Sequence, residues 1–155
     1  MSDTRNLLWH YSLALYKEIE PWCLQMQDDH NANVNLLLLC CFAGSRGCCL
    51  TIDQLSDAEN AIASWDEQVV QPLRQLRRQL PLMQHGDAKQ LLLDAELKAE
   101  HHIQSQLWQW WQQQPESDRP ADATAIAANL NLYISQLGAS LTPATVIDCA
   151  VRAAG

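Results

Sequence analysis

Apolar side chains recur every three or four residues along most of the chain, which is the spacing of α-helices with a buried face. In the first segment, Asp3 or Thr4 can cap a helix that runs to about Ile19. Pro21 then fits the first turn of a short second helix that ends near His30. The pattern therefore predicts two helices here, separated just before the proline.

The next segment is the most hydrophobic part of the chain. Asn33 can cap a helix that runs from Val34 to about Arg46, and Gly47 can end it. Apolar residues cover nearly the whole circumference of this helix, so other helices must surround it. We expect it to be the central helix of a bundle.

Two longer helices are predicted from the middle of the sequence. Ser56 and Glu59 have the spacing of a capping box at the start of the first one. Its apolar stripe crosses Pro72 without a change of phase, which predicts one helix kinked at the proline, although two helices that meet at Gln71 would give the same stripe. The second long helix begins at residue 86 and ends by residue 115.

The fold class follows from these elements together with the end of the chain. Residues 116–122 resemble a short linker, helical spacing then returns up to Gly138, and Thr142 and Pro143 can open a last short helix. We predict an all-α protein, a single-domain helical bundle of about six or seven helices around a central apolar helix. Residues 1–115 are expected to form the bundle core, and the two C-terminal helices within 116–155 to pack on the same domain.

Composition and charge narrow the possible partners. The 155 residues are rich in leucine, alanine and glutamine, as expected for helices. A net charge of −8 argues against nucleic acid, because binding to a phosphate backbone depends on clustered lysine and arginine. The longest apolar run, Val34 to Ala43, is about half of the ~20 residues that span a bilayer. The N-terminal residues lack the pattern of a signal peptide, so we expect a cytoplasmic protein that binds neither nucleic acid nor membrane.

One stretch carries a family resemblance. The residues CLQMQDDHNANVNLLL, Cys23 to Leu38, together with LWHYSLALY, Leu8 to Tyr16, resemble a family of short bacterial helical proteins described as a domain of unknown function. The family pattern is similar to CLxLQDxxGxDVNLLL. Asn31 stands where the family has glycine and Asn33 where it has aspartate; asparagine tolerates a left-handed backbone and can still cap a helix. The resemblance implies the fold of the N-terminal part and no particular activity.

The same stretch contains the first candidate site, a polar corner formed by Gln27, Asp28, His30, Asn33 and Asn35. Carboxylate, amide and imidazole groups can bind a small molecule or a metal ion, and an acid beside a histidine can serve general acid/base catalysis. The structural alternative is that the side chains at positions 27 and 28 hydrogen-bond the open ends of two helices, and that the amide at position 35 finds its partner in the same corner.

Three arginines form a second candidate site. Arg74, Arg77 and Arg78 lie within about one and a half helical turns and could dock an acidic partner. The structural alternative is that positive charge is favourable near the C-terminus of a helix. Further along, Glu96 and Glu100 precede two histidines but lack the spacing of a di-iron bundle, so no metal site is predicted.

Three tryptophans form a third candidate site. Trp108, Trp110 and Trp111 cannot all face one core, because successive residues of a helix diverge by ~100°. At least one of them is expected to be exposed or covered by the C-terminal helices, and exposed tryptophan is a frequent anchor of protein interfaces.

The six cysteines include two adjacent pairs, Cys40 with Cys41 and Cys48 with Cys49. Adjacent cysteines do not easily bond to each other, and the sequence has no C-x-x-C pair. We interpret them as reduced thiols that are mostly buried, with redox sensing by the second pair as the alternative.

These patterns favour a non-catalytic protein-binding or regulatory module that acts through a protein partner or self-association, and they predict no cofactor. The alternative is a small-molecule- or metal-binding protein, or an enzyme, that uses the polar corner from Gln27 to Asn35. The sequence leaves the question of catalysis open.

Overall fold

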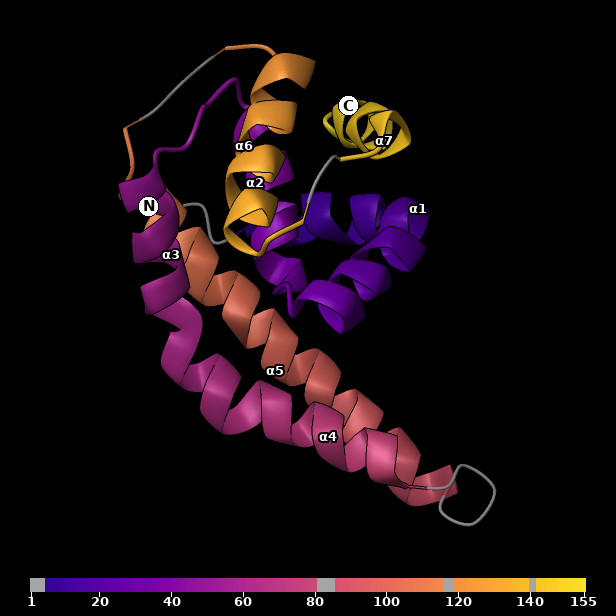
Figure 1. Ribbon diagram of the computed structural model, residues 1–155. Coiled ribbons are helices and arrows are strands. Elements are labelled where there is room, and N and C mark those ends of the chain that lie inside the picture. Colours follow the sequence, from indigo (N-terminus) through magenta and orange to yellow (C-terminus); the bar gives the residue numbers. More distant parts are fainter. Residues whose placement is uncertain (1–4, 81–85, 116–118, 140–141) are drawn as a thin grey trace.

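The computed structural model describes residues 5–80, 86–115, 119–139 and 142–155, and over these residues the chain is helical with no strand (Figure 1). The elements are α1 (Leu7–His30), α2 (Val34–Ser45), α3 (Ile52–Trp65), the π-helical segment η1 (Asp66–Val70), α4 (Gln71–Gln79), α5 (Gly86–Gln112), α6 (Ala123–Gln136) and α7 (Ala144–Ala153). The prediction of a single all-α domain is confirmed. None of the helices in these described parts has the length and apolarity that spanning a bilayer requires.

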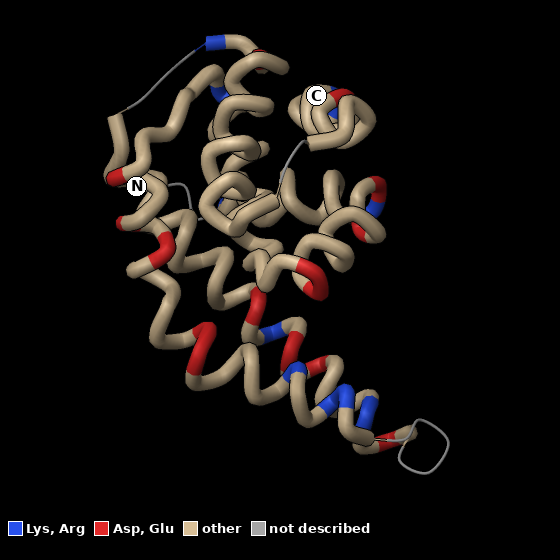
Figure 2. Tube along the Cα trace, in the orientation of Figure 1, with Lys and Arg blue, Asp and Glu red and all other residues tan. Residues whose placement is uncertain are grey.

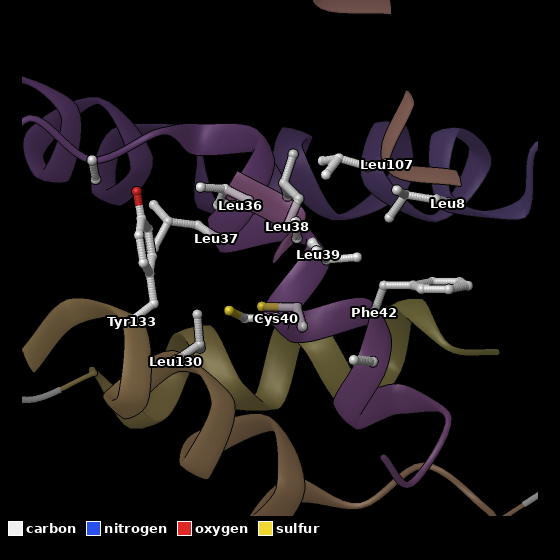
Figure 3. Close-up of a cluster of buried hydrophobic side chains, with 14 of the residues drawn as sticks. Leu8, Leu36, Leu37, Leu38, Leu39, Cys40, Phe42, Leu107, Leu130 and Tyr133 are labelled. Carbon is white, nitrogen blue, oxygen red and sulfur yellow. The ribbon is translucent and has the colours of Figure 1, made fainter. Parts of the chain in front are cut away.

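Helix α2 is the centre of the bundle, as its sequence predicts. All residues from Asn35 to Ser45 are buried, and α1, α5, α6 and α7 pack around the helix. In Figure 3 its leucines lie among side chains of the surrounding helices, which include Leu8 of α1, Leu107 of α5 and Tyr133 of α6. Burial on all sides explains why the helix has no polar face.

Helix α1 differs from the sequence prediction, because it is one helix that contains Pro21. The predicted break after Ile19 is therefore wrong. The buried stripe continues across the proline to Cys23 and Met26, and its packing outweighs the ~3 kcal/mol that an internal proline costs. Asp3 and Thr4 lie outside the described residues; the observed cap is Asn6, whose Oδ1 accepts a hydrogen bond of 2.9 Å from the Trp9 N–H.

Helix α3 begins earlier than predicted. Thr51 caps it, and a capping box forms between Thr51 and Gln54, with hydrogen bonds of 3.0 and 3.1 Å. The predicted box at Ser56 and Glu59 is wrong because both residues lie inside the helix. The chain stays helical from α3 through η1 into α4, as the continuous stripe predicts. The wide π turns of η1 end at Val70, and Gln71 separates them from Pro72, whose missing N–H removes one helical hydrogen bond.

Helices α4 and α5 pair as a hairpin that extends away from the other helices (Figure 1). The C-terminal half of α5 returns to the bundle and supplies Ile103, Leu107 and Trp110 to the core. The two ends of α5 therefore have different roles, since one pairs with α4 and the other fills the bundle.

Helix α6 packs along α2 at very short range. A Cβ atom on Gly44 would lie 2.5 Å from the backbone of Ile126, so only glycine allows this approach. Asn129 fixes the same pair of segments: its Nδ2 donates to the carbonyl oxygens of Cys40 (3.2 Å) and Cys48 (2.8 Å), and its Oδ1 accepts from the Leu50 N–H (2.8 Å).

Helix α7 packs against α1 and α6, and the Tyr11 hydroxyl donates a hydrogen bond of 2.8 Å to the Ala150 carbonyl oxygen. The helix begins at Ala144 with Pro143 as its N-cap, and Thr142 does not cap it. The Thr142 hydroxyl instead donates to Oδ1 of Asn131 at 3.2 Å.

Candidate functional site

The corner between α1 and α2 is closed by two asparagines and a tyrosine. Asn31 ends α1 in the left-handed conformation, with φ 56°. Asn33 caps α2 by accepting a hydrogen bond of 2.9 Å from the Asn35 N–H, and the Asn33 N–H donates to the Tyr133 hydroxyl at 2.8 Å. Asparagine thus serves both positions, as the sequence predicts.

Asp28 has a different role from the one that the sequence suggests. Its side chain is 56% exposed, and Oδ1 accepts a hydrogen bond of 3.0 Å from Nη2 of Arg78. The interpretation that Asp28 bonds the helix ends at the corner is wrong, because the backbone there is bonded by Asn33, Tyr133 and the carbonyl oxygen of Gln27. His30 lies partly exposed in the last turn of α1.

The buried amide of Asn35 finds its partner on α5 instead of at the corner. Nε2 of Gln104 donates a hydrogen bond of 2.9 Å to Oδ1 of Asn35, and the Ser12 hydroxyl donates to Oε1 of Gln104 at 3.3 Å. All three side chains are buried, with residue exposures of 1 to 7%. This network links α1, α2 and α5, and no sequence pattern points to Gln104.

Beside this network lies the feature that we call the leucine groove, a depression of about 540 Å³ between α1, α2, α4 and α5. Leu13 and Leu24 of α1 and Leu93 and Leu97 of α5 line it and are 39 to 56% exposed. Ser12, Asn35 and Gln104 also line the groove. It therefore combines exposed leucines with many polar and charged side chains, among which the buried amides are held in place by hydrogen bonds.

Ion pairs between α4 and α5 form another wall of the leucine groove. Nε of Arg77 lies 2.6 Å from Oε2 of Glu96, while Arg74 lies 3.4 Å from Glu96 and 3.1 Å from Glu100. Hydrogen bonding to Glu96 raises the pKa of Arg77, and burial raises the pKa of Glu100 against the opposing effect of Arg74. Figure 2 shows basic and acidic positions close together along this hairpin.

These ion pairs determine how far the arginine cluster is exposed to solvent and how much of its charge is neutralised. The side chains of Arg74 and Arg77 are only 17 and 24% exposed, and Arg78 is paired with Asp28. The positive charges are therefore balanced within the chain. The spacing in the sequence is compatible with these ion pairs, because the arginines lie at i and i+3 of α4 and the glutamates at i and i+4 of α5. The pairs could be predicted only if it were known that the two helices pack against each other.

A second depression, the polar groove, lies on the other side of Arg74 and has a volume of about 600 Å³. Gln27 and Asn33 of the corner line it together with Glu59 and Tyr133. Burial raises the pKa of Glu59 and that of the Tyr133 hydroxyl. Within the described residues, no three His, Cys, Asp or Glu side chains are placed to hold a metal ion.

The three tryptophans have different environments. Trp110 is buried in the core, whereas Trp108 and Trp111 are half-buried and meet the Phe42 ring edge-on, with centroid distances of 6.2 and 5.3 Å. Trp108 and Trp111 line a third depression, which lies on the side of the molecule where α2 and α5 end. The sequence argument that the three rings cannot share one environment is consistent with this arrangement.

One known family matches most of the chain. Residues 7–107 match the family described as "Protein of unknown function (DUF2390)". The chain belongs to this family. The DUF2390 match runs from the start of α1 into α5, well beyond the two stretches Leu8 to Tyr16 and Cys23 to Leu38 that carry the resemblance in the sequence. Every residue that lines the leucine groove lies within the match. Neither the curated proteins nor the solved structures include a match to the chain.

Proposed function

We propose that the chain is a non-catalytic protein-binding module in which the leucine groove receives the apolar face of a helix from a partner protein. One observation carries the proposal: four of the seven large hydrophobic side chains that are exposed among the described residues line this groove. Exposed apolar side chains are ordinary when scattered, but their concentration in one depression is typical of interaction sites.

The shape and charge of the groove indicate the kind of partner. The walls are formed by helices, and an amphipathic helix fits such a groove with residues spaced at i, i+3, i+4 and i+7. Among the charged residues that line it, the ion pairs of the described chain leave Glu20 and Asp94 without a basic partner. A helix with lysine or arginine beside its apolar face would complement these two carboxylates.

The polar groups of the groove support recognition in preference to catalysis. Arg74, Arg77, Glu96 and Glu100 bond to one another, and the buried amides are paired as well. We further propose a cytoplasmic location, supported by six free cysteines, since disulfides are common in oxidising compartments and rare in the cytoplasm.

The test uses a fluorescein-labelled synthetic helix with leucines at i, i+3, i+4 and i+7 and lysines on its flanks. Fluorescence anisotropy should show binding to the wild type, and Leu97→Gln or Leu13→Gln should weaken it by roughly tenfold, as loss of an interface anchor does. Both positions are exposed, so circular dichroism should show unchanged helicity.

Ile52→Gln is the matched control, since Ile52 is 59% exposed and lies outside the groove. A peptide with glutamate in place of lysine should bind more weakly than the original. Equal affinity of the basic peptide for the wild type and both groove variants would contradict the proposal. Sedimentation that shows a dimer broken by Leu97→Gln would assign the groove to a second copy of the chain instead.

The second candidate function is small-molecule binding or catalysis at the polar groove, where the corner residues Gln27 and Asn33 lie beside Glu59. The raised pKa of Glu59 supports this alternative, because perturbed carboxyl groups are common in functional sites. A thermal-shift screen of metabolites and divalent metal ions would favour it if a compound stabilises the wild type and fails to stabilise Glu59→Gln.

A further inference from the structure

The polar groove has more negative than positive charge that is free to act on a ligand. Glu59, Asp66 and Glu67 line it from α3 and η1, and they form no ion pair with any described residue. Arg74 and Arg78 line it from α4, but both are ion-paired with carboxylates that lie outside the groove. The groove therefore attracts cations.

The parts of the chain that are not described contain no lysine or arginine that could neutralise these carboxylates. All ten lysines and arginines lie among the described residues. The three carboxylates belong to the range 5–80, which is described without a gap. Burial raises the pKa of Glu59, and no neighbouring cation opposes this effect. A positive charge beside Glu59 therefore comes from solution or from a ligand.

The acidic side chains share one face of a continuous helix. Asp66 and Glu67 follow Glu59 by seven and eight residues, so they lie two turns further along the same side. With a rise of 1.5 Å per residue, this spacing separates the two ends of the acidic face by about 10 Å. Asp66 and Glu67 also open the π-helical segment η1, a rare structure that is frequent at functional sites.

Tyr133 adds a hydrogen-bond donor at the corner of the same groove. The residue is only 4% exposed, and its ring points from α6 toward the corner between α1 and α2 (Figure 3). Its hydroxyl oxygen accepts from the Asn33 N–H at 2.8 Å, but its O–H has no acceptor among the described residues. A buried donor without an acceptor is costly, so a ligand that brings an oxygen to this point is favoured.

We propose that the polar groove binds a short basic segment of a partner protein in an extended, polyproline-II-like conformation. This conformation leaves the carbonyl oxygens free, and it brings positions i and i+3 to the same side about 9 Å apart. Lysines or arginines at these two positions pair with Glu59 at one end and with Asp66 and Glu67 at the other. A carbonyl oxygen of the segment accepts a hydrogen bond from Tyr133.

The proposal is independent of the leucine groove, and it gives the polar groove a protein ligand in place of a small molecule. Gln27 and Arg74 line both grooves, so the two sites are neighbours on the molecule. The net charge of −8 favours the approach of a basic segment.

The test measures fluorescence anisotropy of a fluorescein-labelled peptide whose core is lysine, proline, proline and lysine. Glu59→Gln should weaken binding by roughly tenfold, and the more exposed Glu67→Gln by at most about fivefold. Both changes keep the shape of the side chain, and burial disfavours the charge of Glu59, so the folded state should keep its stability. Raising the salt concentration should weaken binding, since the groove is open to solvent.

Two controls separate this site from general charge effects and from the leucine groove. Asp57→Asn removes one negative charge at an exposed position of α3 outside the polar groove and should leave the affinity unchanged. Leu97→Gln should not affect this peptide, even if it abolishes binding of the amphipathic helix. A peptide with glutamine in place of both lysines should bind at least roughly tenfold more weakly than the basic peptide.

NMR of the three tyrosines gives a readout that does not depend on substitutions. The ring signals of Tyr133 should shift when the peptide is added. Those of Tyr16, in the leucine groove, and of Tyr11, bonded to Ala150, should not.

Three results would overturn the proposal: no binding, equal affinity for the basic and the glutamine peptides, or equal affinity of the Glu59→Gln and Asp57→Asn variants. Displacement of the peptide by free spermidine at concentrations below that of the peptide would also overturn it and would assign the groove to a small cation.

Discussion

The side-chain amide of Gln104 on α5 donates a hydrogen bond of 2.9 Å to Oδ1 of Asn35 on the central helix. Both residues are buried, and Gln104 also accepts from the Ser12 hydroxyl. The pair places two amides of different helices inside an apolar core, where a polar group without a partner is costly. It is therefore expected to be sensitive to removal of either side chain.

Asn35→Leu and Gln104→Leu should each lower the free energy of unfolding by about 1 to 3 kcal/mol, because each leaves a buried amide without its partner. The double variant should be less destabilised than the sum of the two. Urea denaturation of the four proteins measures this coupling. Asp28→Ala combined with Asn35→Leu is the control and should be additive, since no contact joins these residues.

The acidic residues that bond to the arginine cluster should differ in their effect on stability. Glu96→Gln should cost about 1 to 3 kcal/mol, because Glu96 is buried and bonds to both Arg74 and Arg77. Asp28→Asn should cost less than about 1 kcal/mol, because the Asp28–Arg78 pair is more than half exposed and screened by water. Chemical denaturation measures both effects, and a larger loss of stability for Asp28→Asn than for Glu96→Gln would contradict the prediction.

Glycine at the crossing of α2 and α6 should not be replaceable. Gly44→Ala should destabilise the protein by about 1 to 3 kcal/mol or more, because the methyl group of the alanine would collide with the backbone of Ile126. Gly86→Ala is the matched control, since none of the described residues lies within 4 Å of a Cβ there. It should be neutral or slightly stabilising in thermal denaturation. Equal melting temperatures of the two variants would show that α6 can shift away from α2.

The cysteines should react with iodoacetamide in the order of their exposure. Cys49 is exposed and should be alkylated first, whereas Cys40 and Cys41 are fully buried and should react only when the protein opens. Peptide mass spectrometry after short labelling times measures the order. Rapid modification of Cys40 in the folded protein would mean that α2 is not enclosed in solution.

Stability should fall at alkaline pH. Burial raises the pKa of the Cys23 and Cys40 thiols from 9.0 to about 12 and that of the Tyr16 hydroxyl from 10.0 to about 12. Between the unfolded and folded pKa values the unfolded chain releases protons that the folded chain retains, so the free energy of unfolding decreases as pH rises. Each group contributes up to about 1.4 kcal/mol per pH unit in that range.

Denaturation curves from neutral pH to pH about 11 test this prediction, because the decline should begin near the ordinary thiol pKa of 9.0. Cys40→Ala should have a shallower decline than the wild type, because one of the contributing groups is gone. The same slope in both proteins would show that other groups dominate the alkaline transition.

The sequence by itself determined which segments are helical and which helix is central. The leucine-rich run from Val34 has no polar face, so burial on all sides is its only stable environment, and Asn33 marks where it starts. Such patterns depend on contacts between residues three or four positions apart, which a sequence displays directly. The local interpretation failed at Pro21, where packing of a long apolar stripe outweighed a helix breaker. It also chose the wrong capping box for α3, which begins at the earlier box of Thr51 and Gln54 instead of Ser56 and Glu59.

Only the tertiary structure decided which polar side chains meet. Asn35 bonds to Gln104 across 69 residues of sequence, and Arg78 bonds to Asp28 across 50. The leucine groove and the polar groove are likewise assembled from segments that are distant in the chain. The physical reason is that a side chain's partner depends on how helices cross and pair, and helix packing permits several arrangements of the same amphipathic pattern.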